Sequence, residues 1–91
     1  MTNICVLGNF VADNSFYAKQ LPTKGQTVFG TGYQIGPGGK GSNQAIAAAR
    51  LESVVSFLGK IGNDANGRMA IDLYKKNKID QKTIFVSNDY P

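Results

Sequence analysis

The chain has 91 residues, of which 42% are apolar and 18% charged, and a formal net charge of +4. This size and composition fit one small domain with a modest core. The basic residues are scattered except for Lys75, Lys76 and Lys78 at the end of a predicted helix, where cations favour the helix dipole, so nucleic acid is not an expected partner.

The apolar runs of the chain speak against contact with a membrane. None of them approaches the roughly 20 residues that span a bilayer, and no basic region followed by a long apolar stretch marks a signal peptide. We therefore expect a cytoplasmic protein with no membrane partner.

The first predicted strand is the apolar run from Ile4 to Leu7, which Gly8 closes. Such a run is typical of a strand buried on both faces, so we expect it in the centre of a parallel sheet. Cys5, the single cysteine, is then a small buried hydrophobe, and we expect no catalytic role for it because the chain has no histidine to activate it. Asp13 follows this strand at the edge where ligands bind in open α/β sheets, and is either a ligand-binding carboxylate or a solvated turn residue.

Residues 15–21 and 26–34 mix aromatic with polar side chains and are separated by Pro22-Thr23-Lys24-Gly25, a typical turn sequence. This pattern predicts an antiparallel pair with one face exposed to water. Because the pair interrupts a simple strand-helix-strand unit, we expect it to stand off the sheet as a lid that covers the ligand-binding edge and excludes water.

A turn with four glycines and one lysine, residues 36–41, leads directly into an alanine-rich helix. Glycines permit positive φ and let a bound molecule approach the main chain closely. We expect the helix to begin near Ser42 or Asn43, with Ser42 as its cap, and to end near Leu51. It points its free N–H groups and the positive end of its dipole at this turn. The combination is typical of a small-anion or polyol site.

The remainder of the chain predicts the second half of a parallel α/β unit. Residues 54–60 form a buried strand reached by a right-handed crossover, Asp64 caps a helix over residues 65–77, and residues 83–86 form a third strand. One face of that helix is apolar and carries Met69, Ala70, Leu73 and Tyr74. Three strands and two helices leave the sheet incomplete, so we expect the N-terminal part of a longer protein or a truncated product.

Two phosphate-binding patterns and a polyol site compete as interpretations of the glycine-rich turn. Gly36 to Gly41 formally match the dinucleotide fingerprint G-x-G-x-x-G, but the residues before them are too polar for the buried strand that this fingerprint follows. The P-loop pattern fails because Gly41 stands where a hydroxyl residue would hold magnesium. A polyol site, in which main-chain amides, Lys40 and Asn43 meet Asp13, gives every residue a role. A nucleotide-cofactor oxidoreductase stays open as an alternative.

The run from Gly38 to Ala45, followed by the alanine-rich helix and by Gly59 to Gly67, resembles the first signature of the ribokinase-like carbohydrate kinases, the PfkB family. The resemblance covers essentially the whole chain. It implies the N-terminal part of a three-layer α/β/α fold with a small antiparallel lid within about residues 15–35. It also implies transfer of the γ-phosphoryl group of ATP to a hydroxymethyl group of a small sugar, Mg²⁺ and a monovalent cation as further cofactors, and a homodimer formed through the lid.

The same resemblance assigns the sugar contacts. It implies that Asp13 accepts hydrogen bonds from two sugar hydroxyls. Gly38 and Gly39 would be the hinge of the lid and touch the sugar with their main chain, and Lys40 and Asn43 would add further contacts. The family's catalytic aspartate and glycine-rich anion hole belong to a second signature, Asp-Thr-x-Gly-Ala-Gly-Asp, which this sequence does not contain. We therefore expect no catalytic or nucleotide-binding residue here and no activity of the isolated chain, and a non-catalytic sugar-binding remnant is the second alternative.

Val11 departs from the family pattern, which has an asparagine two residues before the sugar-binding aspartate. An apolar side chain cannot hydrogen-bond a hydroxyl, and burying a hydroxyl without a partner costs on the order of 1–3 kcal/mol. We therefore hypothesise a substrate that lacks a hydroxyl at this point, such as a deoxypentose, or one that is turned differently in the pocket. Neutral drift at a tolerant pocket wall is the alternative.

Overall fold

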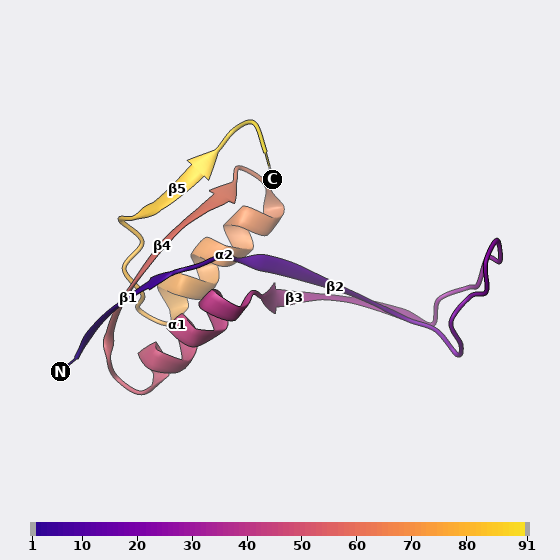
Figure 1. The fold of residues 1–91 in the computed structure, drawn as a ribbon, viewed down its shortest axis with the longest axis horizontal. Helices are drawn as coiled ribbons and strands as arrows, with labels where there is room; N and C mark the ends of the chain where they lie inside the picture. Colours follow the sequence, from indigo (N-terminus) through magenta and orange to yellow (C-terminus); the bar gives the residue numbers. More distant parts are fainter. Residues whose placement is uncertain (1, 91) are drawn as a thin grey trace.

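The computed structural model describes residues 2–90, which form a three-stranded parallel sheet, two helices and a projecting two-stranded hairpin (Figure 1). The strands of the parallel sheet follow the order β1-β4-β5. The elements in chain order are β1 (Asn3–Leu7), β2 (Val11–Tyr17), β3 (Gly32–Gly38), α1 (Lys40–Arg50), β4 (Val54–Gly62), α2 (Ala65–Lys76) and β5 (Ile84–Ser87). The predicted α/β class with a small antiparallel hairpin is confirmed.

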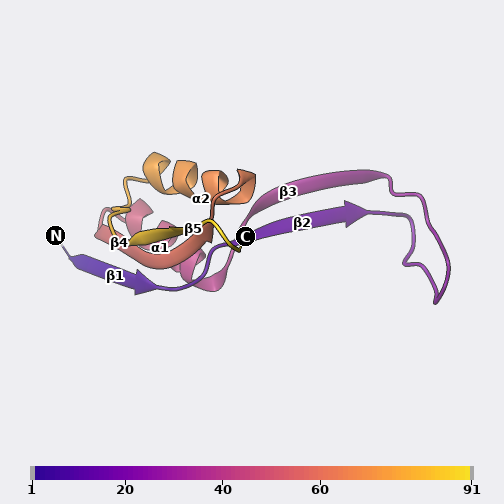
Figure 2. The same ribbon diagram turned by 90° about the horizontal axis from the view of Figure 1, so that it is seen from above.

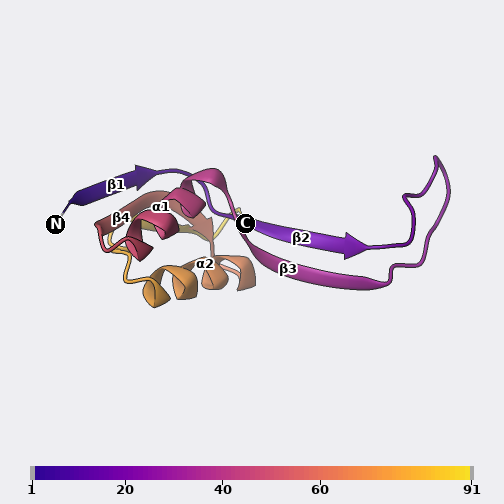
Figure 3. The same cartoon turned by 90° about the horizontal axis from the view of Figure 1, so that it is seen from below.

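The core lies between β4 and the two helices. Alternate residues of a strand share one face, and the face of β4 that carries Val55, Phe57 and Ile61 is buried. The helices α1 and α2 lie side by side against this face (Figure 3). The other buried apolar residues of the core are Ala45, Ile46, Ala70, Tyr74 and Ile79.

β1 was predicted to be a central strand, but it lies at an edge of the sheet that residues 2–90 form. Within residues 2–90 it pairs with β4 alone, in parallel. Its residues alternate between exposed and half-buried, and Cys5, which was predicted to be buried, is exposed. Both helices cover the same face of the sheet, and an apolar run cannot by itself distinguish a strand with one covered face from a strand with two.

The opposite face of the sheet is bare within the described residues. Leu7 and Phe85 are exposed there, and Leu58, the partner of Leu7 in the parallel register, is half-buried. Residues 2–90 therefore contain two layers of the three-layer α/β/α arrangement that the sequence predicted.

The hairpin of β2 and β3 begins earlier in the chain than predicted. Its antiparallel register runs from Val11 opposite Gly38 to Tyr17 opposite Gly32, so the lid is defined here as residues 11–38 rather than 15–35. Asp13 was predicted to follow the first strand at the ligand-binding edge, but residues 11–14 form the start of β2 and pair with residues 35–38. Figure 2 shows the lid projecting beyond the sheet, and the longest axis of the molecule measures 52 Å.

The predicted turn in the lid is present but is part of a longer irregular segment, residues 18–31. The N–H of Gln26 donates to the carbonyl oxygen of Thr23 at 2.9 Å, which closes the turn. The flanking residues do not continue the ladder, and Pro22, which lacks an N–H group, could not donate to it.

α1 begins at Lys40, and its cap residue is Gly39 rather than the predicted Ser42. Ser42 does not cap the helix because its hydroxyl group lies inside the molecule, where it accepts a hydrogen bond from the hydroxyl of Tyr74 at 2.8 Å. With 11 and 12 residues, α1 and α2 both fall short of the length and hydropathy that a bilayer-spanning helix requires.

Candidate functional site

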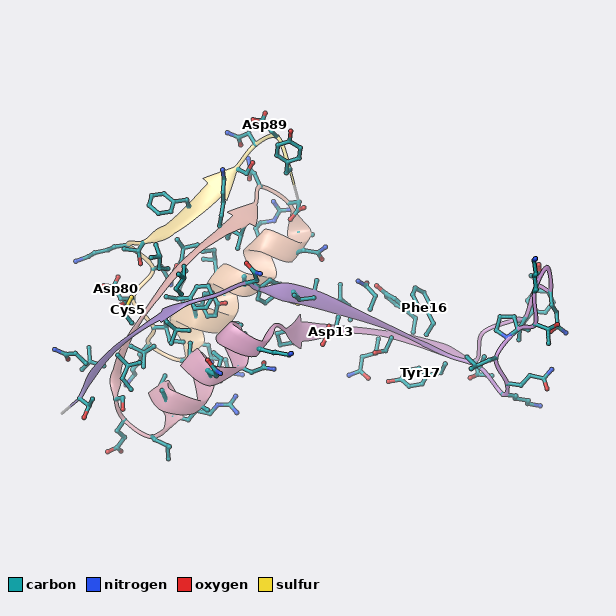
Figure 4. All side chains as sticks on the ribbon, in the orientation of Figure 1. Cys5, Asp13, Phe16, Tyr17, Asp80 and Asp89 are labelled. Carbon is teal, nitrogen blue, oxygen red and sulfur yellow. The ribbon has the colours of Figure 1, made fainter. Side chains whose placement is uncertain are left out.

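Asp13 lies on β2 at the base of the lid, near the start of α1 (Figure 4). It pairs with Gly36 of β3, and its carboxylate fills the space in which a side chain at Gly38 would stand. A β-carbon at Gly38 would overlap this carboxylate, so glycine is needed there for Asp13 to keep its position. The predicted carboxylate and the first predicted hinge glycine are therefore in contact, although Asp13 lies in a lid strand and not in a loop after β1.

Gly39 joins the lid to α1 in a left-handed conformation, with φ 96°. Residues that carry a β-carbon seldom adopt this conformation. A β-carbon at this position would also overlap the carbonyl oxygen of Asn9, in the connection that enters the lid. The connections into and out of the lid thus cross in direct backbone contact, immediately before the first turn of α1.

The first turn of α1 has main-chain N–H groups that are free to bind a ligand. The first hydrogen bond of the helix runs from the N–H of Asn43 to the carbonyl oxygen of Gly39 at 2.9 Å, which leaves the N–H groups of residues 40–42 without an intrahelical acceptor. No side chain of residues 2–90 caps this end. By contrast, Asp64 closes the N-terminus of α2, as predicted, by accepting a hydrogen bond from the N–H of Gly67 at 2.8 Å. The open end of α1 favours hydroxyl oxygens or an anion.

The charged and amide side chains at this site have unused hydrogen-bonding capacity. Asp13, Lys40 and Asn43 are exposed, and none of their side chains is hydrogen-bonded to another residue within 2–90. A carboxylate offers only acceptors, a lysine ammonium only donors, and an asparagine amide both. The site therefore offers a hydroxylated ligand both kinds of partner.

Val11 shares a face of β2 with Asp13, because the two residues are two positions apart on one strand. It lies opposite Gly38 in the ladder and is 45% exposed. The structure therefore places an apolar side chain beside Asp13 at the base of the lid, where the family pattern has an asparagine.

A cavity of about 250 Å³ lies beside this group, between the entry to the lid and the loop from β4 to α2. Of the predicted site residues, Val11 alone lines it. Sequence reasoning assigned no ligand contact to Lys60 or Asn66, although both belong to the run Gly59 to Gly67 that carried part of the resemblance. The lining residues are Phe10, Val11, Ala12, Lys60, Ile61, Gly62, Asp64, Asn66 and Gly67.

An acceptor carboxylate on β2, an open helix N-terminus and two exposed donor side chains in the first turn of α1 thus belong to the elements that join the antiparallel lid to the parallel α/β sheet. Donors and acceptors of these kinds are chemically suited to a small, hydroxyl-rich ligand. The chain belongs to the pfkB family of carbohydrate kinases, whose sequence model matches residues 1–91.

Individual relatives include ribokinases and deoxyribokinases. The chain is 44% identical to the ribokinase of Bacillus subtilis (strain 168) over 79 residues, which are 87% of this chain and 27% of that protein. It is 45% identical to the deoxyribokinase of Salmonella typhimurium (strain LT2) over 62 residues, which are 68% of this chain and 20% of that protein. The structure of Arabidopsis thaliana ribokinase complexed with ribose and ATP matches with a TM-score of 0.85 and 29% identity, over 97% of this chain and 28% of that one. The chain thus spans about a quarter of the length of its relatives.

Proposed function

We propose that these residues are the sugar-binding N-terminal portion of an ATP-dependent kinase that phosphorylates a hydroxymethyl group of a small sugar. The observation that carries the proposal is the carboxylate of Asp13, which stands against the glycine connection at the open N-terminus of α1. Membership of the carbohydrate kinase family and the likeness to a ribokinase complexed with ribose and ATP support the same chemistry.

Each group of the site has a role that its chemistry allows. Asp13 accepts hydrogen bonds from two sugar hydroxyls. Gly38 and Gly39 let the sugar approach the main chain, and Lys40 and Asn43 donate hydrogen bonds to its oxygen atoms. The lid covers the bound sugar and keeps water away from the phosphoryl group that is transferred.

Phosphoryl transfer also needs groups that we place in a C-terminal portion of a longer kinase. A carboxylate must take the proton of the attacking hydroxyl, and Mg²⁺ on the nucleotide phosphates neutralises the developing charge. Residues 2–90 hold no cluster of three His, Cys, Asp or Glu side chains that could bind a metal ion. We therefore assign ATP, Mg²⁺ and a monovalent cation mainly to residues outside this chain, and expect no turnover of ATP by the 91 residues alone.

The two alternative functions predict different observations. An oxidoreductase fingerprint would lie between a parallel strand and a helix, but Gly36 and Gly38 belong to the antiparallel strand β3. Nicotinamide or flavin absorbance in the purified protein would nevertheless favour that function. A non-catalytic remnant would bind sugar without phosphorylating it and would have no downstream Asp-Thr-x-Gly-Ala-Gly-Asp sequence.

The proposal is tested by the steady-state kinetics of Asp13→Asn in the full-length kinase. Two hydrogen bonds to a charged acceptor, each contributing about 1.5–3 kcal/mol, predict a fall of at least about 100-fold in kcat/KM for the sugar, while the KM for ATP stays unchanged. Asp72→Asn, which alters an exposed aspartate of α2, is the matched control and should keep the wild-type value. A wild-type kcat/KM for Asp13→Asn would contradict the proposed role.

We further propose, from Val11, that the substrate is a deoxypentose. Relatives named ribokinase and deoxyribokinase are 44% and 45% identical to this chain, so identity does not separate the two substrates. Val11→Asn restores a hydrogen-bonding side chain beside Asp13, and we expect it to raise the ratio of kcat/KM for ribose to that for deoxyribose by about 5- to 150-fold, the equivalent of 1–3 kcal/mol. Ser15→Asn adds the same side chain farther out on the same face and should leave the ratio unchanged. A clear preference of the unmodified kinase for ribose over deoxyribose and fructose would refute this assignment.

We also propose that the lid joins two copies of the kinase. The lid face opposite Asp13 carries Phe16 and Tyr33, which are both exposed and whose ring centres lie 4.9 Å apart. Exposed apolar patches mark interaction surfaces. We expect light scattering to show a dimer that Phe16→Glu converts to a monomer, whereas Lys24→Glu at the exposed lid turn leaves it intact. A monomeric unmodified kinase at micromolar concentration would disprove the lid interface.

A further inference from the structure

Tyr74 of α2 is buried against the first turn of α1. Its side chain is 0% exposed, and its hydroxyl donates a hydrogen bond at 2.8 Å to the hydroxyl oxygen of Ser42, which is 1% exposed. A tyrosine hydroxyl inside a core needs such a partner, because burying it without one is costly. Within residues 2–90, no buried side-chain polar atom lacks a partner. The bond is therefore the buried polar connection between the two helices.

The ring of Tyr74 also contacts the entry to the lid. Phe10, the residue before β2, packs edge-on against it, with ring centres 6.3 Å apart and an interplanar angle of 85°. Phe57 of β4 holds the ring from the sheet, with ring centres 4.9 Å apart. Phe10 precedes the lid, and Ser42 follows Gly39, the residue after the lid, by three positions. The side chain of Tyr74 therefore contacts the chain just before and just after the lid.

We propose that Tyr74 is a positioning residue, which holds the first turn of α1 in register with the entry to the lid. The inference rests on the proposed function and adds to it a residue remote from the sugar. Lys40 and Asn43 lie on the same helical turn as Ser42 but are exposed where Ser42 is buried. The hydrogen bond of Ser42 therefore fixes the rotation of this turn about the helix axis, and with it the direction of both exposed side chains.

The expected consequence is a lower apparent affinity for the sugar. If the first turn loses its anchor, only a fraction of molecules keeps Lys40 and Asn43 in the binding arrangement, and the apparent dissociation constant rises by the inverse of that fraction. The chemical step is unaffected once the sugar is bound. The effect should therefore be a rise in the KM for the sugar, with little change in kcat or in the KM for ATP.

The test is the kinetics of Tyr74→Phe and Ser42→Ala in the full-length kinase, each of which removes one hydroxyl and keeps the rest of the side chain. We expect each to raise the KM for the sugar about three- to tenfold, as the loss of one neutral hydrogen bond predicts, with kcat and the KM for ATP changed less than about twofold. Both changes delete the same bond, so the double variant should raise the KM no further than the larger single effect. Ser42→Thr keeps the hydroxyl and should keep a KM near the unmodified value.

Control variants and an assay that does not depend on turnover separate positioning from stability. Tyr90→Phe and Ser53→Ala remove hydroxyls away from this contact and should keep the unmodified KM. Hydrogen exchange of the N–H groups of residues 43–46, the first that donate hydrogen bonds within α1, should be faster in Tyr74→Phe. A kinase that phosphorylates no sugar would refute the proposed function, and the exchange rates would then decide the inference by themselves. Three results would each overturn the positioning role. They are unchanged hydrogen exchange, an unchanged KM for the sugar despite a lower melting temperature, and additive effects on the KM in the double variant.

Discussion

Replacing Gly39 by alanine should destabilise the protein strongly, because two separate costs meet at this residue. A β-carbon at φ 96° costs about 1–2 kcal/mol. The same atom would overlap the carbonyl oxygen of Asn9, and backbone movement to relieve such overpacking typically costs about 1–3 kcal/mol. The lower entropy of an unfolded chain with alanine returns about 0.4–1 kcal/mol. The expected net loss in the free energy of unfolding is about 1–5 kcal/mol, a large share of the 5–15 kcal/mol typical of a domain.

Two other glycines separate these contributions. Gly25 also has a positive φ, 79°, but a β-carbon there would have no heavy atom within 4 Å, so Gly25→Ala bears the cost of the backbone conformation alone. Gly36 has neither a positive φ nor a neighbour within 4 Å. We expect Gly25→Ala to cost up to about 1.5 kcal/mol, and Gly36→Ala to be neutral or to stabilise by up to about 1 kcal/mol.

Urea unfolding of the full-length kinase and the three variants measures these differences. The expected order of destabilisation is Gly39→Ala, then Gly25→Ala, then Gly36→Ala. If Gly39→Ala cost no more than Gly25→Ala, the two lid connections would not cross in backbone contact.

Three further predictions concern α2. Asp64→Ala should lower the free energy of unfolding by about 1 kcal/mol through the lost cap, and Asp64→Asn should lower it less; equal losses in urea titrations would speak against capping. Gly67→Ala should lower the melting temperature. The new β-carbon would overlap the carbonyl oxygen of Gly62, and this cost of about 1–3 kcal/mol outweighs the gain of up to about 1 kcal/mol in helix propensity. A higher melting temperature would show that the backbone moves to accommodate the β-carbon at little cost. Burial raises the pKa of Tyr74 above 10.0, and the hydrogen bond with Ser42 partly opposes the rise. The stabilisation present below about pH 10 should therefore be lost as the pH rises through the folded pKa, by up to about 1.4 kcal/mol per pH unit. If the free energy of unfolding depended on alkaline pH in the same way in the unmodified protein and in Tyr74→Phe, this prediction would be contradicted.

The elements that the sequence predicted well are those whose signals are local. The cap at Asp64 and the helix after it depend on a hydrogen bond between residues three positions apart, so the chain near them suffices. The glycine-rich turn is likewise explained locally, because Gly39 adopts the left-handed backbone that such a turn requires. The position of Asp13 between a strand and this turn was enough to identify it as a candidate, and the structure brings its carboxylate against Gly38.

The predictions that failed depended on partners distant in the chain. Cys5 is exposed because no segment of residues 2–90 covers its face of the sheet, and the strand's own residues do not reveal which faces are covered. Val11 belongs to the lid because it pairs with Gly38, 27 positions later in the chain. Ser42 faces the core because Tyr74, on another helix, donates a hydrogen bond to it.

The amino-acid sequence by itself determined the class of the fold, the order of its elements and the residue types that can bind a hydroxylated ligand, since these follow from hydrophobic periodicity, turn residues and side-chain chemistry within short stretches. Tertiary structure decided which strand is central, where the lid begins and which hydroxyl caps or anchors a helix. Those outcomes depend on which surfaces become buried together, and burial is a property of contacts between segments that lie far apart along the chain.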